Sequence, residues 1–177
     1  MSDTFDISEL YSHFTSSEAV KEGTARGTIP AGIYVVTIKK AEPRVAGDRY
    51  PWPGRKTIAL QLSAERDGVV KGTLFSDVSP FDMDQFRTKS GKLDGVATLW
   101  THLKKALDPE GTADDGVIFE QLTRFPLEAY IQETFDCGPD GDGKTIYKNA
   151  TTEDERKKYF EQGFVARNRV SSFRRLK

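Results

Sequence analysis

The chain has 177 residues, of which 37% are hydrophobic and 30% are charged, and its 26 basic and 27 acidic residues leave a formal net charge of -1. This length is typical of one domain of about 100–200 residues, and the longest apolar run, residues 33–36, is far too short for a membrane span. The acidic first residues do not resemble a signal peptide, and the single cysteine, Cys137, cannot form an internal disulfide bond. Membrane-spanning and disulfide-rich secreted classes are therefore disfavoured, and we expect a cytoplasmic protein.

Charge is unevenly distributed along the chain. Residues 156–177 hold eight basic residues and one acid, and residues 39–71 hold eight basic residues and four acids. Between them, residues 108–142 hold ten acids and one base. Each block alone fits an ordinary solvated surface. If the fold joins the two basic segments, however, the molecule presents a polyanion-binding side despite its neutral total.

Residues 1–27 predict an extension made of a short helix and a loop. Asp6 followed by Glu9 matches a helix-capping pattern, and the neighbouring apolar residues recur at helical spacing. We expect the main domain to occupy residues 28–177.

Three strands are predicted next. β-Branched residues predict a strand over 33–41, and a loop rich in proline and glycine follows over 42–55. Alternation of apolar and polar residues predicts a second strand over 56–65. Asp67-Gly68 then predicts a hairpin that leads into a third strand over 69–76.

The second half of the chain predicts a helix and two further strands. Apolar residues recur at helical spacing from Val96 to Leu107, and the acidic residues 108–116 predict a loop. Alternation predicts a fourth strand over 127–135, and the last strand is expected over 163–173. Three strands, a helix and two strands is the order of an OB-fold. We therefore predict a mainly β, α+β protein with a five-stranded OB-fold barrel.

Residues 138–145 match the phosphate-binding loop pattern G-x-x-x-x-G-K-[ST]. Such a loop needs a helix directly after its lysine, whereas residues 145–147 predict extended structure. Asp140 and Asp142 would also repel phosphate, so we interpret the segment as a turn. Counted from Asp136, the loop lacks the carboxylate that an EF-hand needs at its twelfth position. We assign no metal and no cofactor.

Catalytic chemistry finds little support in the sequence. His13 and His102 both lie on predicted helices, and Cys137 has no histidine near it. The carboxylates fall in acidic loops without a pairing pattern. We predict no catalytic residue and no enzymatic activity.

Aromatic residues interleaved with basic ones are the main functional signal. Aromatic rings can stack on unpaired bases while basic side chains follow the phosphates. In an OB-fold, the loop after the first strand and the loop between the last two strands border the nucleic-acid groove. The predicted contact residues are Arg44, Arg49, Tyr50, Trp52, Arg55, Lys56, Lys71, Phe75, Lys144, Tyr147, Lys148, Arg167 and Arg169. Trp52, which lies between two prolines, fits equally well as a ring that covers the end of the barrel.

Two segments resemble a family of phage-encoded single-stranded-DNA-binding proteins. Residues 28–34 (T-I-P-A-G-I-Y) lead into a strand of the form V-x-I-x-x-A-E and are similar to the P-x-G-x-Y start of the family's first strand. Residues 168–173 (N-R-V-S-S-F) are similar to the strand that closes the family's barrel. The resemblance spans residues 28–173. It implies an OB-fold that coats and protects single strands during phage DNA replication or recombination, without sequence preference, in the host cytoplasm.

The partner implied by this resemblance is single-stranded DNA, with replication or recombination proteins and further copies of the chain as additional candidates. Many single-strand-binding proteins end in an acidic tail that recruits other enzymes, whereas this sequence ends in F-R-R-L-K. Either recruitment uses another surface, such as residues 108–116, or the protein is not a hub of replication.

Two other functions remain open. A β-barrel module that binds another protein fits the near-neutral charge, since dedicated nucleic-acid-binding domains are usually basic. A nuclease or annealing enzyme would need a cluster of carboxylates to hold a metal ion.

Overall fold

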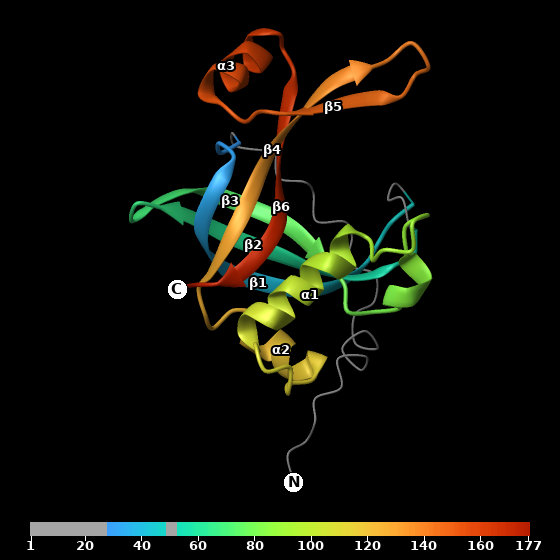
Figure 1. The fold of residues 1–177 in the computed structure, drawn as a ribbon, viewed down its shortest axis with the longest axis vertical. Helices are drawn as coiled ribbons and strands as arrows, with labels where there is room; N and C mark the ends of the chain where they lie inside the picture. The colour runs from blue at the N-terminus through green and yellow to red at the C-terminus, as the bar shows by residue number, and fades with distance from the viewer. Residues whose placement is uncertain (1–27, 49–52) are drawn as a thin grey trace.

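The computed structural model describes residues 28–48 and 53–177 (Figure 1). The predicted N-terminal helix within residues 1–27 lies outside this range. In chain order the elements are β1 (Gly32–Val45), β2 (Lys56–Arg66), β3 (Val69–Val78), the 3₁₀ helix η2 (Met83–Phe86), α1 (Gly95–Leu107), α2 (Asp115–Gln121), β4 (Leu127–Pro139), β5 (Thr145–Asn149), α3 (Glu153–Glu161) and β6 (Val165–Arg175). Within the described ranges, no helix is both long and apolar enough to cross a membrane.

The six strands form one antiparallel sheet. Its order is β3-β2-β1-β4-β5, and β6 pairs with the other edge of β4. β1 pairs with Leu127–Ile131 of β4 and β5 pairs with the later part of β4, so β1 and β5 lie end to end along one edge. The α+β class is confirmed. The described residues contain six strands rather than five, and no strand pairing among them closes the sheet between β3 and β6.

Helix α1 packs against both β3 and β6, the strands that border the open side of the sheet. Its apolar side contributes Leu99, Trp100 and Leu103 to the core. Trp100 is 1% exposed, and its indole N–H donates to the Asp115 carboxylate at 3.0 Å. The helix predicted from apolar spacing over residues 96–107 is therefore present, and Trp100 lies in the core.

Several predicted loops contain regular structure. β1 continues to Val45, where the sequence predicted a loop from residue 42; Pro43 is tolerated because, among the described strands, this part of β1 pairs only with β2. Helix α2 begins inside the predicted loop 108–116, with the Asp114 carboxylate accepting from the Val117 N–H at 2.9 Å. β5 and α3 occupy the segment before the last strand. The extended structure predicted over residues 145–147 lies in β5, whereas the sequence did not predict helix α3.

The segment that matches a phosphate-binding loop is the turn of the β4–β5 hairpin. β5 begins at Thr145, so a strand and not a helix follows Lys144. One oxygen of the Asp140 carboxylate accepts from the backbone N–H groups of Asp142 and Lys144, both at 2.9 Å. The interpretation of this segment as a turn is confirmed.

The two segments that carry the family resemblance contact each other. The side-chain amide of Asn168 in β6 accepts from the Ile29 N–H and donates to the Ile29 carbonyl, both at 2.8 Å. The Tyr34 hydroxyl donates to the Pro30 carbonyl at 2.6 Å. These bonds fix the lead-in to β1 against β6. They explain locally why an asparagine and a tyrosine occupy these positions.

A buried ion pair holds the same lead-in next to Asn168, because Glu133 of β4 is the cross-strand partner of Asn168. Glu133 of β4 is fully buried, and its carboxylate accepts from the Arg156 guanidinium of α3 at 2.7 Å. Arg156 also donates to the Thr28 carbonyl at 3.0 Å, and the Thr28 hydroxyl donates to Glu133. Because a buried charge needs a partner, this network couples α3, β4 and residue 28.

Burial raises the pKa of Tyr34 above its ordinary value of 10.0, although the Arg66 guanidinium, 4.0 Å from the ring centroid, acts in the opposite direction. The unfolded chain therefore loses this proton at lower pH than the folded protein. The stability from a neutral Tyr34 is complete below pH 10 and falls as the pH rises further. We expect the urea midpoint of the wild type to fall more steeply between pH 9 and 11 than that of Tyr34→Phe. Tyr147→Phe, at an exposed tyrosine, is the control; equal slopes for wild type and Tyr34→Phe would contradict this account.

Candidate nucleic-acid interface

The outer face of β3 carries two of the predicted contact residues. Leu74 and Val78 point into the core, while Lys71, Thr73 and Phe75 alternate with the core residues and are exposed. Both predicted contact residues, Lys71 and Phe75, are therefore exposed, as a contact residue has to be. The Phe75 ring is 59% exposed. An apolar ring left in water contributes little to folding, so it is free to contact a ligand.

The outer face of β6 carries two arginines. Arg167 lies opposite Thr134 of β4 and Arg169 lies opposite Gln132, and both are exposed on one face, as predicted. Neither forms an ion pair with any other described residue. The Arg169 guanidinium lies beside Gly95 at the start of α1, where an added Cβ would come within 3.1 Å of it. Two guanidinium groups thus remain available to an external anion.

The predicted residues of the β4–β5 hairpin divide between the two faces of the sheet. Tyr147 pairs with Asp136, which in turn pairs with Val165 of β6, so the three residues share the outer face. With strands about 4.8 Å apart, Tyr147 lies about 10 Å from β6. Its ring is 60% exposed. Lys148 lies on the opposite face, with Nζ 6.0 Å from the Tyr159 ring of α3, and Lys144 is exposed beside the turn.

Two predicted residues lie near the β1–β2 connection. Arg44, at the end of β1, forms an ion pair with Asp77 of β3 and retains 24% of its side-chain exposure. This ion pair therefore joins β1 to β3 across β2. Lys56, the first residue of β2, is exposed.

The structure corrects the expected exposure of Arg55. This residue is 3% exposed, and its guanidinium forms an ion pair with Asp94, the N-cap residue of α1. Its Cζ atom lies 4.2 Å from the centroid of the Phe86 ring. Burial lowers the pKa of Arg55 from its ordinary value. Arg55 therefore joins the start of β2 to α1 and is not part of the candidate interface.

The three remaining predicted residues, Arg49, Tyr50 and Trp52, lie outside the described residues, and their roles stay predictions. The base of their loop is closed by two backbone bonds. The Ala46 N–H donates to the Arg55 carbonyl at 2.7 Å, and the Gly54 N–H donates to the Ala46 carbonyl at 2.8 Å.

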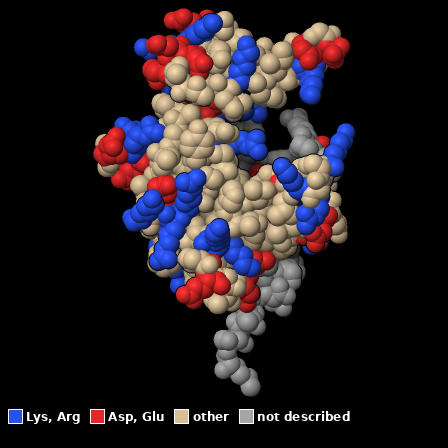
Figure 2. Space-filling model, in the orientation of Figure 1, with Lys and Arg blue, Asp and Glu red and all other residues tan. Residues whose placement is uncertain are grey.

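The exposed residues of β3 and the two arginines of β6 lie on neighbouring strands, because β3 and β6 contact each other at the open side of the sheet. In Figure 2, Lys and Arg side chains are spread over the face on which β6 and α1 lie, and most acidic side chains lie towards its rim. The part of the chain described by the structure contains no group of three His, Cys, Asp or Glu residues that could hold a metal ion.

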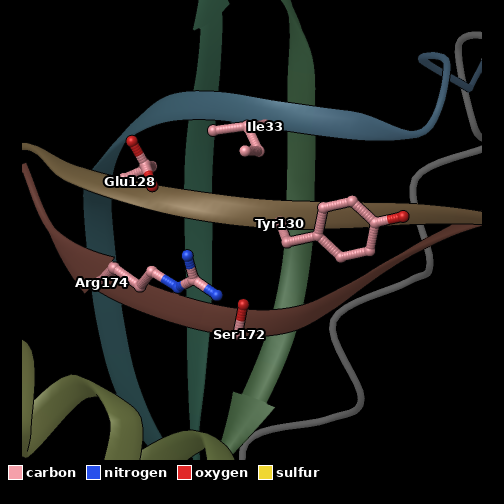
Figure 3. Close-up of a pocket in the computed structure, with 5 residues that line it drawn as sticks. All are labelled: Ile33, Glu128, Tyr130, Ser172 and Arg174. Carbon is pink, nitrogen blue, oxygen red and sulfur yellow. The ribbon is translucent and has the colours of Figure 1, made fainter.

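Sequence analysis did not anticipate a shallow pocket on the outer face of β1, β4 and β6 (Figure 3). The residues that line it are Ile33, Glu128, Tyr130, Ser172 and Arg174. Alternation along β4 could have identified Glu128 and Tyr130 as outward-facing. Ser172 and Arg174 could not be placed, because a register shift in β6 precedes them.

A scan against protein-family models and a search of curated proteins found no match to the chain. The resemblance to phage single-stranded-DNA-binding proteins therefore stays a prediction.

Proposed function

We propose that the protein binds single-stranded DNA without catalysis and without sequence preference, and that it coats and protects single strands in phage DNA replication or recombination. One observation carries the proposal. Two aromatic rings, Phe75 and Tyr147, are each about three-fifths exposed. They belong to β3 and β5, the strands that flank the β4–β6 pair, which presents Arg167 and Arg169.

This arrangement suits the two chemical parts of a single strand. Unpaired bases offer flat faces, and stacking on an aromatic side chain contributes about 1–3 kcal/mol per base. Guanidinium groups without an internal acidic partner can bind phosphates through charge-assisted hydrogen bonds. Stacking does not depend on the identity of the base, and a duplex keeps its bases inside. The same surface therefore favours single strands over duplex and tolerates any sequence.

The order of the strands also supports an OB-like fold for the domain that carries this surface. Without β5 and α3, the remaining strands form the order β3-β2-β1-β4-β6, with α1 between β3 and β4 in sequence. Three strands, a helix and two strands is the OB-fold order, and the OB barrel is itself only partly closed. In this reading β5 and α3 are an insertion in a loop that borders the binding groove.

Fluorescence anisotropy with a labelled oligo-dT tests the proposal. If about four basic side chains neutralise phosphates, the logarithm of the association constant should fall with the logarithm of salt concentration with a slope of roughly -3. A duplex of equal length should bind more weakly at each salt concentration, and added Mg²⁺ should leave the DNA intact. Absence of binding at low salt, or a slope near zero, would contradict the proposal.

A module that binds another protein is the second candidate. The observation that favours it is the exposed apolar tip of the β2–β3 hairpin, where Val69 and Val70 are more than half exposed. A protein of this kind would elute from single-stranded-DNA cellulose at low salt. Elution only at high salt would count against it.

A further inference from the structure

The pocket in Figure 3 combines an apolar side, a cation and an acid on three neighbouring strands. Ile33 of β1 lies opposite Tyr130 of β4, which in turn lies opposite Ser172 of β6. Glu128 and Arg174 form the adjacent cross-strand pair. Tyr130 is 40% exposed and Ile33 is 54% exposed, so the apolar side of the pocket is open to solvent.

A bulge in β6 places the pocket in line with the two arginines described above. Tyr130 pairs with Ser172 while Ile131 pairs with Val170, which leaves Ser171 as the extra residue. The Ser171 hydroxyl donates to the Tyr130 carbonyl at 3.2 Å. Without the extra residue, simple alternation would put Ser172 and Arg174 on the core side. With it, both share the outer face of Arg167 and Arg169.

We propose that this pocket binds one nucleotide unit of the same single strand, with the base against Tyr130 and Ile33 and its phosphate at Arg174 and Ser172. This inference rests on the proposed function. Tyrosine and a branched apolar side chain offer a flat contact for a base, while a guanidinium and a hydroxyl donate hydrogen bonds to phosphate oxygens.

Arg167, Arg169 and Arg174 form a row of arginines on the outer face of β6, and this row is longer than a free nucleotide. Arg167 and Arg174 are seven residues apart on one strand, which corresponds to about 20 Å. Only a ligand of several linked nucleotides contacts both ends at once. The row therefore extends the interface along β6, away from the β4–β5 hairpin and towards the C-terminal end of the strand.

Glu128 should oppose this binding. Removing its charge is therefore expected to raise the affinity for DNA, whereas removing Arg174 or Tyr130 is expected to lower it. The Glu128 carboxylate makes no ion pair with the rest of the described chain, and Figure 3 shows the Arg174 guanidinium beside Ser172, on the β6 side of Glu128. A carboxylate beside the phosphate position repels it. Glu128→Gln should therefore raise the affinity for oligo-dT severalfold, whereas a role in fold stability alone would leave the affinity unchanged.

The test compares oligo-dT binding by pocket variants of the full chain over a salt series. Arg174→Ala should reduce the magnitude of the salt slope by about 0.7, the value for one phosphate contact on a single strand. Tyr130→Ala should weaken binding about tenfold, within the range of one lost stacking contact, and Tyr130→Phe should restore it. The matched control is Arg175→Ala, since Arg175 is an exposed neighbouring arginine that does not line the pocket, and it should keep the wild-type slope.

These measurements distinguish a wrong pocket proposal from a wrong proposed function. If wild type binds with a steep salt dependence but Arg174→Ala and Tyr130→Ala bind like wild type, the pocket proposal is wrong and the function stands. The same holds if Arg175→Ala lowers the slope as much as Arg174→Ala. If wild type binds no single strand at low salt, both are wrong.

Discussion

The double variant Arg167→Ala, Arg169→Ala should bind oligo-dT at least about a hundredfold more weakly than wild type at low salt. Each arginine loses one charge-assisted hydrogen bond to phosphate, which contributes about 1.5–3 kcal/mol. The salt slope should also fall in magnitude by about 1.4, the value for two phosphate contacts. Fluorescence anisotropy over a salt series gives both quantities from the same titrations.

A matched control separates a specific surface from general attraction by positive charge. Lys157 and Lys158 are exposed on α3, and α3 packs its Tyr159 and Phe160 rings on Phe135, whose side chain points to the face opposite the arginines. Lys157→Ala, Lys158→Ala removes the same two charges and should change the affinity only slightly. Equal losses in the two double variants would contradict an interface on β6.

The second large effect concerns stability. Glu133→Ala should lower the free energy of unfolding by about 3–5 kcal/mol, the usual cost of removing one partner of a buried ion pair. The Arg156 side chain is only 21% exposed, and it would be left without its main acidic partner. Urea denaturation followed by circular dichroism measures the change.

The control for this variant is Glu153→Ala, because Glu153 also contacts Arg156. Glu153 lies 3.7 Å from the Arg156 guanidinium but is 56% exposed at the side chain. Glu153→Ala should cost less than about 1 kcal/mol, because water screens an exposed ion pair. A loss below 1 kcal/mol for Glu133→Ala would show that the network does not hold the lead-in to β1 in the way described.

Elements with a strong local pattern could be predicted from the sequence. In β2 and β4, apolar residues alternate with polar ones because one face of each strand packs on the core. The same alternation correctly placed Phe75 and Lys71 on the outer face of β3. Helix α1 was recognisable because its buried residues recur along one side.

Elements that depend on distant contacts could not be predicted. β5 is polar on most positions and pairs only with β4, so it lacks an apolar face with period two. Helix α3 has no buried residue, and its aromatic rings pack on Phe135 outside the main core. Its capping pattern, in which Thr152 accepts from the Glu155 N–H at 3.2 Å, was the local signal available.

The candidate site shows the same limit. Arg55 follows a Pro-Gly turn and therefore looked exposed, but its burial depends on Asp94, which lies 39 residues further along the chain. Arg174 required knowledge of the bulge at Ser171, which results from pairing with β4. Arg167 and Arg169 were predictable because they precede the bulge, where simple alternation still holds.

Photocrosslinking tests the central claim most directly, because it reports both binding and the surface used. An oligonucleotide with 5-iododeoxyuridine is bound at low salt and irradiated, and the crosslinked peptides are identified by mass spectrometry. We predict crosslinks to Tyr147 and Phe75, and to Tyr130 if the pocket is occupied, all lost at high salt. Crosslinks confined to α2 or α3, or no crosslink at any salt concentration, would contradict the account.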